Sequence, residues 1–284
     1  MSPLVASARR AGHAGGKGED FHGDGRAGAG AFSLAGETAL VTGASSGFGA
    51  RFARTLAANG ARVVLAARRR ARLEVLAAQI AASGGQALAV EADATDEAAM
   101  TAAFDAAEAA FGTVTILVAN AGTALAARAV ETTPQQWRAT MALNLDAPFM
   151  AAQIAARRMI AQERKGAIVM TSSITAGMVE RGMAAYAVSK AALAQLTRAL
   201  ALEWGPRGVR VNALAPGYVA TRLNADFLNG PAGTAMAKRL PLRRLGQAED
   251  LDGALLLLAA RGRGAWITGT LLVADGGHLL VGGG

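Results

Sequence analysis

A tyrosine and a lysine four residues apart are the side chains of this sequence best suited to proton transfer. Tyr186 and Lys190 stand in Tyr-Ala-Val-Ser-Lys, and Ser173 precedes the tyrosine by thirteen residues. Positions i and i+4 share one face of a helix, so the lysine can lie beside the phenol. An ammonium about 4 Å away favours the phenolate by roughly 4 kcal/mol in a partly screened site, which lowers the tyrosine pKa toward neutrality. The spacing therefore predicts a tyrosine acid/base, with Ser173 placed to hold a developing oxyanion.

A glycine-rich turn near residue 43 predicts a dinucleotide-binding site. The turn reads Thr42-Gly43-Ala44-Ser45-Ser46-Gly47-Phe48-Gly49. Glycines let the backbone turn sharply and let a phosphate approach the free N–H groups at a helix N-terminus. The spacing Gly-x-x-x-Gly-x-Gly is one residue longer than the usual fingerprint. Its place between an expected strand and an expected helix favours the dinucleotide interpretation.

The same turn contains Gly43-x-Ser45-x-Gly47, the pattern of a serine-hydrolase nucleophile elbow. Such a hydrolase needs a histidine base after the serine, and His278 is the one histidine that follows it. A hydrolase also leaves Tyr186 and Lys190 without a role. The hydrolase interpretation is therefore the weaker alternative.

The residues after the second expected strand favour NADP(H) over NAD(H). NAD enzymes favour an acidic residue there for the ribose hydroxyls, whereas this chain has Arg68-Arg69-Arg70-Ala71-Arg72. The macrodipole disfavours cations at the start of a helix, a conflict that a bound 2′-phosphate would relieve. We predict NADP(H) with Arg68 at the phosphate. A solvated arginine run, and with it NAD(H), stays open as the alternative.

The third expected strand is followed by Asp93 and Ala94, which we expect near the adenine. The alternative for Asp93 is an N-terminal cap of the helix that follows Thr95.

Composition excludes several classes of function. The chain has no cysteine, and His13, His22 and His278 show no metal-ligand spacing, so we expect no disulfide and no metal site. The net charge of +8 comes from scattered arginines with few aromatic residues between them, so no nucleic-acid partner is predicted. The longest apolar stretches, such as Leu255–Ala260, are too short to span a bilayer. We expect a soluble cytoplasmic protein.

Short β-rich runs alternate with amphipathic helical patterns from residue 36 onward. This alternation predicts an α/β, doubly wound Rossmann fold, with a seven-stranded parallel sheet covered by helices on both faces. The clearest helix places Met100, Phe104, Ala107 and Phe111 on one face. We expect residues 34–284 to form one domain and residues 1–33, rich in Gly, Ala and Arg, to form a disordered tail. The expected strands are Thr38–Thr42, Arg62–Ala67, Ala87–Glu91, Val114–Ala119, Ala167–Thr171, Arg210–Leu214 and Thr270–Ala274.

Seven motifs follow one another over roughly residues 36–278. They are Thr42-Gly43-x-x-x-Gly47-x-Gly49, Ala119-Asn120-Ala121-Gly122, Asn144, Ser173, Tyr186-x-x-x-Lys190, Pro216-Gly217 with Thr221, and Asp275-Gly276-Gly277. With these motifs in this order, the chain resembles the short-chain dehydrogenase/reductase family. Ala119 departs from the family pattern, because the family usually has asparagine there.

The resemblance implies a catalytic tetrad of Asn144, Ser173, Tyr186 and Lys190. Tyr186 would exchange a proton with the substrate oxygen, and Ser173, with Ser172 as the alternative serine, would hydrogen-bond that oxygen. Lys190 would lower the pKa of Tyr186 and bind the nicotinamide ribose, and Asn144 would hold a water that links Lys190 to solvent. Further cofactor contacts would come from Asn120, Ala121, Gly122, Pro216, Gly217, Val219 and Thr221.

The predicted reaction is hydride transfer between nicotinamide C4 and the carbonyl carbon of a small-molecule substrate. Specificity is expected in the segment Tyr218–Arg244, whose arginines and lysine suggest an anionic or polyhydroxylated substrate or else face solvent. The resemblance does not decide between two groups of family members with different substrates, the sugar-acid dehydrogenases and the 3-oxoacyl-carrier-protein reductases. An acidic acyl carrier protein would dock on Arg157, Arg158, Arg164 and Lys165. A homotetramer is expected by resemblance, and a dinucleotide sensor without turnover is the alternative class.

Overall fold

Seven parallel strands form the sheet on which the candidate site is built. The computed structural model describes residues 32–220 and 230–281. Within these ranges the strand order is β3-β2-β1-β4-β5-β6-β7, and every neighbouring pair is parallel. The chain order reverses between β1 and β4, which is the arrangement of a doubly wound fold. The predicted fold class is confirmed. The strands are β1 (Thr38–Thr42), β2 (Arg62–Ala67), β3 (Gln86–Glu91), β4 (Ile116–Ala119), β5 (Gly166–Thr171), β6 (Val209–Pro216) and β7 (Leu271–Ala274).

Strand positions follow the apolar runs of the sequence, because a parallel sheet is buried on both faces. β1 and β5 are buried along their whole length. The expected and observed ends differ by one or two residues at five strands. β6, for example, continues to Pro216, because its last residues still pair with β7.

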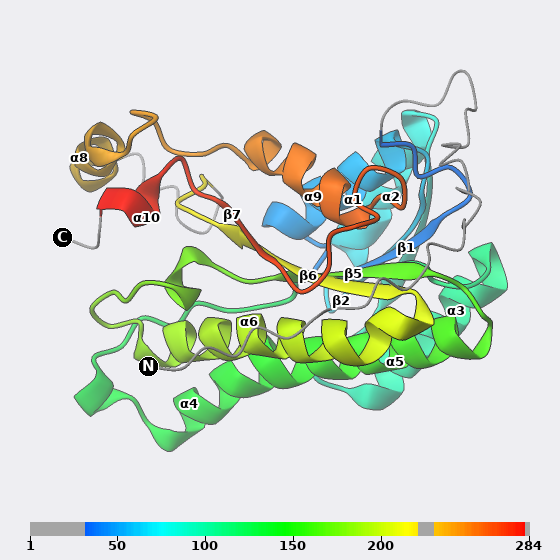
Figure 1. The fold of residues 1–284 in the computed structure, drawn as a ribbon, viewed down its shortest axis with the longest axis horizontal. Helices are drawn as coiled ribbons and strands as arrows, with labels where there is room; N and C mark the ends of the chain where they lie inside the picture. The colour runs from blue at the N-terminus through cyan, green and yellow to red at the C-terminus, as the bar shows by residue number, and fades with distance from the viewer. Residues whose placement is uncertain (1–31, 221–229, 282–284) are drawn as a thin grey trace, which may run out of the picture.

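Helices cover both faces of the sheet. Figure 1 shows α1, α2 and α9 on one face and α3, α5 and α6 on the other. The predicted stripe on α3 is correct, since Met100, Phe104 and Ala107 are buried against the sheet. The helices are α1 (Gly47–Ala58), α2 (Arg70–Ala82), α3 (Glu97–Phe111), α4 (Pro134–Met141), α5 (Ala147–Ala161), α6 (Ala184–Trp204), α8 (Pro231–Arg239), α9 (Asp252–Ala259) and α10 (His278–Val281).

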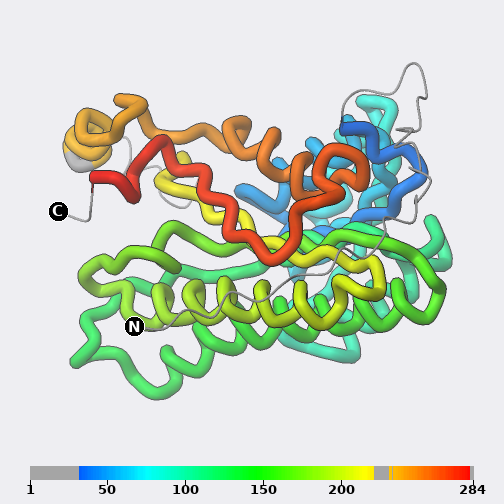
Figure 2. The backbone as a smooth tube through the Cα atoms, in the orientation of Figure 1, coloured from blue at the N-terminus to red at the C-terminus, as the bar shows by residue number. Residues whose placement is uncertain are grey.

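The carboxyl ends of the central strands point to one end of the molecule. Figures 1 and 2 show α8, α10 and the segments that follow β4 and β5 gathered there. In an open α/β sheet, ligands bind outside the carboxyl ends of the strands, at the point where the strand order reverses. The fold therefore directs the search for a site to this end.

The segment before β7 is fastened to the sheet by one half-buried arginine. Arg210 of β6 donates hydrogen bonds to the carbonyls of Leu258, Ala260 and Ile267 at 2.9, 3.0 and 3.0 Å. These are carbonyls that the end of α9 and the following turn leave without helix partners. Arg210 thereby fixes the path that leads to the edge strand.

None of the helices in the described ranges has both the length and the apolar character needed to cross a bilayer. The expected tail, residues 1–33, lies outside the described residues apart from Phe32 and Ser33.

Phe104 offers a test of the core under the site. Its side chain is fully buried between α3 and the sheet, so Phe104→Ala leaves a cavity. We expect the free energy of unfolding to fall by about 3–5 kcal/mol in urea titrations. Val130→Ala, at a position 93% exposed, is the control and should change it by less than about 0.5 kcal/mol. A loss below about 1 kcal/mol for Phe104→Ala would contradict the packing described here.

Candidate active site

Helix α6 begins by presenting Tyr186 and Lys190 at the carboxyl end of β5. The lysine Nζ lies 5.6 Å from the centre of the tyrosine ring. Lys190 is buried, and its ammonium donates a hydrogen bond of 2.8 Å to the carbonyl of Thr171, the last residue of β5. The i, i+4 spacing thus brings the two side chains together, with the ammonium directed at the strand end.

The pKa shifts of this pair differ from the sequence expectation. Burial raises the pKa of Tyr186 above its usual 10.0, a hydrogen bond with Ser173 lowers it in part, and the negative charge of Glu180 raises it further. Burial also lowers the pKa of Lys190 from 10.5 to about 8. The expected net lowering of the phenol pKa is therefore wrong for this arrangement, because desolvation raises it by more than the hydrogen bond with Ser173 lowers it.

The structure distinguishes the two neighbouring serines after β5. Ser173 hydrogen-bonds with Tyr186 and accepts a hydrogen bond of 3.1 Å from the Thr175 amide. Ser172 instead donates to the carbonyl of Lys190 at 3.2 Å. Ser173 is therefore the hydroxyl beside the phenol, as the thirteen-residue interval predicted.

Asn144 lies in a π-helical turn, Ala142–Asp146, that joins α4 to α5. The helix widens in this turn and continues without a break. Its amide nitrogen donates to the Thr123 carbonyl at 2.9 Å and to Ser189 Oγ at 3.0 Å, and its oxygen accepts from the Thr123 amide at 2.9 Å. Ser189 in turn donates to the Tyr186 carbonyl at 2.7 Å.

Both N–H groups of the Asn144 amide are thus used within the protein. The water that the resemblance assigned to this residue would have to be held without them. In this structure Asn144 fixes the position of the β4 loop against the first turn of α6, which carries Tyr186. π-Turns of this kind are frequent at functional sites.

The glycine turn packs the ends of β1 and β4 against the start of α1. Gly43 has a left-handed backbone, with φ +67°, and a Cβ there would lie 2.9 Å from the Ala121 Cα. A Cβ on Gly49 would lie 2.6 Å from Asn120 Nδ2. The amides of Asn120 and Ala121 both donate to Thr42 Oγ1 at 3.0 Å, which fastens the two strand ends together.

This turn fits the phosphates of a dinucleotide. α1 begins at Gly47 after Ser46, no side chain caps its first N–H groups, and its first turn contains no acidic residue. Uncapped N–H groups at the positive end of a helix dipole attract an anion. Phe48, also predicted here, lies in this first turn and stacks on Phe52 with ring centres 6.0 Å apart, so its ring belongs to the helix packing.

Arg69, which the sequence did not single out, is the arginine that reaches the glycine turn. Its guanidinium donates to Ser45 Oγ at 2.7 Å and to Ser46 Oγ at 2.8 Å. The predicted Arg68 is largely exposed and lies 3.9 Å from the carboxylate of Asp93. At the start of α2, Arg70 pairs with Glu74 at 2.8 Å, so the protein itself offsets part of the conflict with the helix dipole.

Asp93 does not cap α3. That helix is capped by Asp96, whose carboxylate accepts from the Ala98 and Ala99 amides at 2.9 and 3.1 Å. Asp93 accepts from the amide and hydroxyl of Thr95 at 2.9 and 2.8 Å, which lowers its pKa. Together with Ala94 it stands after β3, on the side of Arg68, where an adenine contact stays a prediction.

The remaining predicted cofactor residues lie at the end of β6 and, for Gly122, in the segment after β4. Gly217 donates to the Ala274 carbonyl at 3.0 Å, and a Cβ there would lie 2.6 Å from the Asp275 Cα. Val219 is buried and pairs with Gly246. Pro216 is the last residue of β6. Gly122 follows Ala121 beside Asn144 and Lys190. Thr221 and the rest of residues 221–229 lie outside the described residues.

Comparison with known proteins identifies the family. Residues 43–278 match the family model described as enoyl-(acyl carrier protein) reductase. Galactitol 2-dehydrogenase (L-tagatose-forming) from Cereibacter sphaeroides is 43% identical over 250 residues, which cover 87% of this chain and 96% of that protein. A short-chain type dehydrogenase/reductase from Mycobacterium marinum has a TM-score of 0.82 at 34% identity, covering 87% of this chain and 97% of the other. This chain belongs to the short-chain dehydrogenase/reductase family.

A further solved structure is gluconate 5-dehydrogenase from Burkholderia cenocepacia J2315 in complex with NADP and tartrate. Its TM-score is 0.83 at 36% identity, and the match covers 88% of this chain and 97% of that one. As a short-chain dehydrogenase/reductase the protein is an oxidoreductase, which confirms the predicted reaction class.

The serine-hydrolase alternative is wrong. The hydroxyl of Ser45 accepts hydrogen bonds from Arg69, and His278 stacks on Tyr218.

Three side chains whose contact the sequence did not indicate meet near the site from separate segments. Tyr218, after β6, donates a hydrogen bond of 2.6 Å from its hydroxyl to Glu180 Oε1. The ring of His278 stacks on Tyr218 with ring centres 5.2 Å apart. Glu180 stands between Ser173 and Tyr186, and that place in the sequence was the one signal that could have indicated it.

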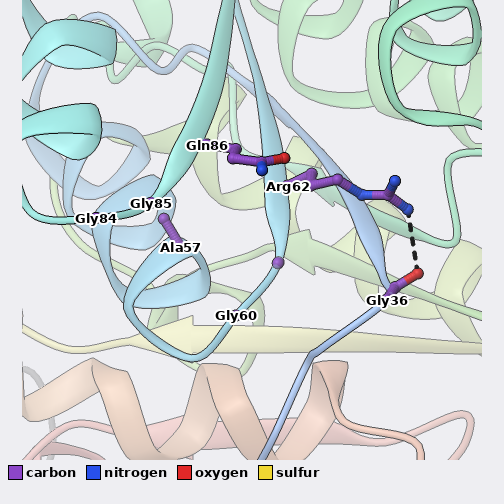
Figure 3. Close-up of a pocket in the computed structure, with 8 residues that line it drawn as sticks. Gly36, Ala57, Gly60, Arg62, Gly84, Gly85 and Gln86 are labelled. Atoms are coloured by element: carbon purple, nitrogen blue, oxygen red, sulfur yellow. Dashed lines mark hydrogen bonds between the residues drawn. The ribbon is translucent and has the colours of Figure 1, made fainter.

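A separate pocket lies at the amino ends of β1, β2 and β3, at the opposite end of these strands. Its volume is about 420 Å³, half of its eight lining residues are glycines, and Arg62 donates to the Gly36 carbonyl at 3.3 Å (Figure 3). In the described parts of the chain, no group of three or more acidic or histidine side chains is placed to hold a metal ion.

The burial of Lys190 predicts a pH-dependent stability difference. Its folded-state pKa, about 8, lies below the ordinary 10.5. The folded protein therefore binds fewer protons than the unfolded chain between these values, and wild-type stability rises with pH across that window. Lys190→Met removes the contribution of this side chain to the pH dependence of the free energy of unfolding. We expect the stability of Lys190→Met relative to wild type to be higher at pH 7 than at pH 10.5, by about 3 kcal/mol.

Urea titrations of both proteins at several pH values from 7 to 10.5 measure this difference. Lys165→Met, at an exposed position, controls for the loss of one positive charge. Parallel stability curves for wild type and Lys190→Met would show that burial does not disfavour the ammonium.

Proposed function

We propose that this protein interconverts a secondary alcohol and a ketone on a polyhydroxylated substrate, with NADP(H) as cofactor. The observation that carries the proposal is the grouping of Ser173, Tyr186 and buried Lys190 at the carboxyl end of β5. A pure dinucleotide sensor would have no use for this grouping, so an enzyme is favoured over the sensor alternative.

Each member of the tetrad has a separate task in the proposed reaction. When bound, the nicotinamide ring accepts or supplies the hydride. Tyr186 gives its phenolic proton to the substrate oxygen in reduction and takes it back in oxidation. Because burial raises its pKa, the phenol is protonated at neutral pH, which suits the donor role. Ser173 holds the same oxygen, and Lys190, with a pKa of about 8, exchanges protons near neutral pH.

Asn144 acts through the backbone that carries Tyr186. Its bonds to Thr123 and Ser189 fix the first turn of α6 against the loop after β4. Such positioning matters because misplacement of reacting groups by about 1 Å is costly.

Three observations support NADP(H) as the cofactor. The uncapped start of α1 suits the pyrophosphate. Arg69, with Arg68 beside it, supplies cations next to Ser45 and Ser46, where a 2′-phosphate would lie. Gluconate 5-dehydrogenase from Burkholderia cenocepacia was solved with NADP. The remaining predicted contacts, from Asp93 to Thr221, belong to this proposal.

A homotetramer formed through α5 and α6 belongs to the same proposal. These helices leave apolar side chains at the surface, including Phe149 at 38% and Leu202 at 81% exposure.

Residues 34–284 are proposed to be one domain, since the sheet draws strands from both halves of that range. A cytoplasmic location is proposed because the chemistry uses an intracellular cofactor.

An acyl carrier protein is not favoured as partner. Arg158, a member of the predicted docking set, is held by Asp105 at 2.6 Å and by Glu108 at 3.0 Å. Its charge is thus used between α3 and α5 and is not offered to a partner.

Tyr186→Phe tests the proposed acid. The variant keeps the ring and loses the proton, so we expect kcat to fall by about a hundredfold or more. The affinity for NADPH, measured by fluorescence titration, should change by less than twofold. Near-wild-type turnover with any confirmed substrate would overturn the assignment.

Arg69→Ala tests the cofactor assignment. A charge-assisted hydrogen bond contributes about 1.5–3 kcal/mol, so the Kd for NADPH should rise about tenfold or more while that for NADH stays unchanged. Arg72→Ala, from the same arginine run, is the matched control. An equal effect on both cofactors would show that Arg69 does not contact the 2′-phosphate.

A further inference from the structure

Glu180 places a carboxylate near the catalytic tyrosine. It lies in the segment that leads from Ser173 to α6, and its charge is close enough to raise the pKa of Tyr186. The tetrad described above does not use this residue. A negative charge that acts on the Tyr186 phenol therefore needs another explanation.

Tyr218 holds this carboxylate in place. Its hydroxyl donates to Glu180 Oε1 at 2.6 Å, and its ring is backed by the stacked ring of His278. Burial and the neighbouring carboxylate raise the pKa of Tyr218 far above its usual value, so the phenol stays a donor. Among the described residues Glu180 Oε2 has no hydrogen-bond partner in the protein. One oxygen of Glu180 is thus fixed, and the other is left for a donor.

We propose that Glu180 selects neutral polyhydroxylated substrates, because its carboxylate accepts a hydrogen bond from a substrate hydroxyl and repels a substrate carboxylate. This inference rests on the proposed function and narrows its substrate class. Polyols and neutral sugars carry hydroxyl donors on the carbons next to the one that reacts. A sugar acid brings a second negative charge to the same place, and like charges at contact distance are strongly disfavoured in a partly buried site.

Two of the four described cations of the specificity segment are engaged away from Glu180. Arg244 pairs with Asp250 at 2.6 Å, and Arg243 donates to the carbonyl of Lys238. The sequence had left an anionic substrate open because of these arginines. Because Arg244 and Arg243 bind other groups of the protein, they favour a neutral substrate over an anionic one.

The test compares matched substrates that differ in one group. The probes are galactitol, glucitol and threitol on one side, and galactonate, gluconate and threonate on the other, each oxidised with NADP+. We expect wild type to have a kcat/KM at least about tenfold higher for at least one polyol than for its matching acid, and Glu180→Gln to reduce that ratio by about tenfold or more, which corresponds to about 1.4 kcal/mol. Glu97→Gln, an exposed carboxylate on α3, is the control and should leave the ratio unchanged.

A positioning effect of Glu180 alone would change kcat for both classes equally and leave the ratio within twofold, which would overturn the inference. Oxidation of the acids but of no polyol by wild type would overturn it as well. So would failure to oxidise any of the six probes. These results are distinct from failure of the proposed function, which would appear as no NADP(H)-dependent turnover in a broad ketone and alcohol screen by a protein that binds NADPH.

Tyr218→Phe provides a second, independent measurement. It removes the donor that holds Glu180 but keeps the carboxylate and the ring stack. We expect KM for the polyols to rise severalfold while discrimination against the acids largely persists. If Tyr218→Phe abolished the discrimination and Glu180→Gln did not, selection would belong to the tyrosine, and the inference would be overturned.

Discussion

The site depends on one ammonium group kept inside the protein. Lys190 is buried at the end of β5, where the Thr171 carbonyl accepts its hydrogen bond. Removing a charge from water is costly, and the cost appears in its lowered pKa. The protein accepts this cost because the sheet and α6 are held together by large apolar contacts on the same face. The ammonium then lies beside Tyr186, where its proton can be exchanged.

The sequence was sufficient for the scaffold and for placing Ser173, Tyr186 and Lys190 near one another, while the tetrad itself stays a proposal. Apolar runs predicted the strands to within one or two residues, because both faces of a parallel sheet are buried. The stripe on α3 and the glycine turn before α1 were also located correctly. These features are local: each is set by a period or by a backbone requirement that a few neighbouring residues express.

Features that depend on the path of the chain were not predictable. Adjacent arginines after β2 look equivalent in sequence, and only the backbone path turns Arg69 toward Ser45 while Arg68 faces Asp93. The direction of the Tyr186 pKa shift was wrong because spacing shows the neighbouring cation but not the burial. Glu180, Tyr218 and His278 come from segments far apart in the chain, so no local pattern announces their contact.

The π-turn that carries Asn144 constrains how the chain can change in length. A single residue beyond the α-helical count is accommodated between α4 and α5. Deleting one residue there would restore uniform α-helical winding and remove the widened turn that places the Asn144 side chain. The amide that joins Thr123 to Ser189 would then leave its partners. An insertion or deletion of one residue in this region would therefore change the geometry of proton transfer at Tyr186, even though it lies outside the helix that carries the tyrosine.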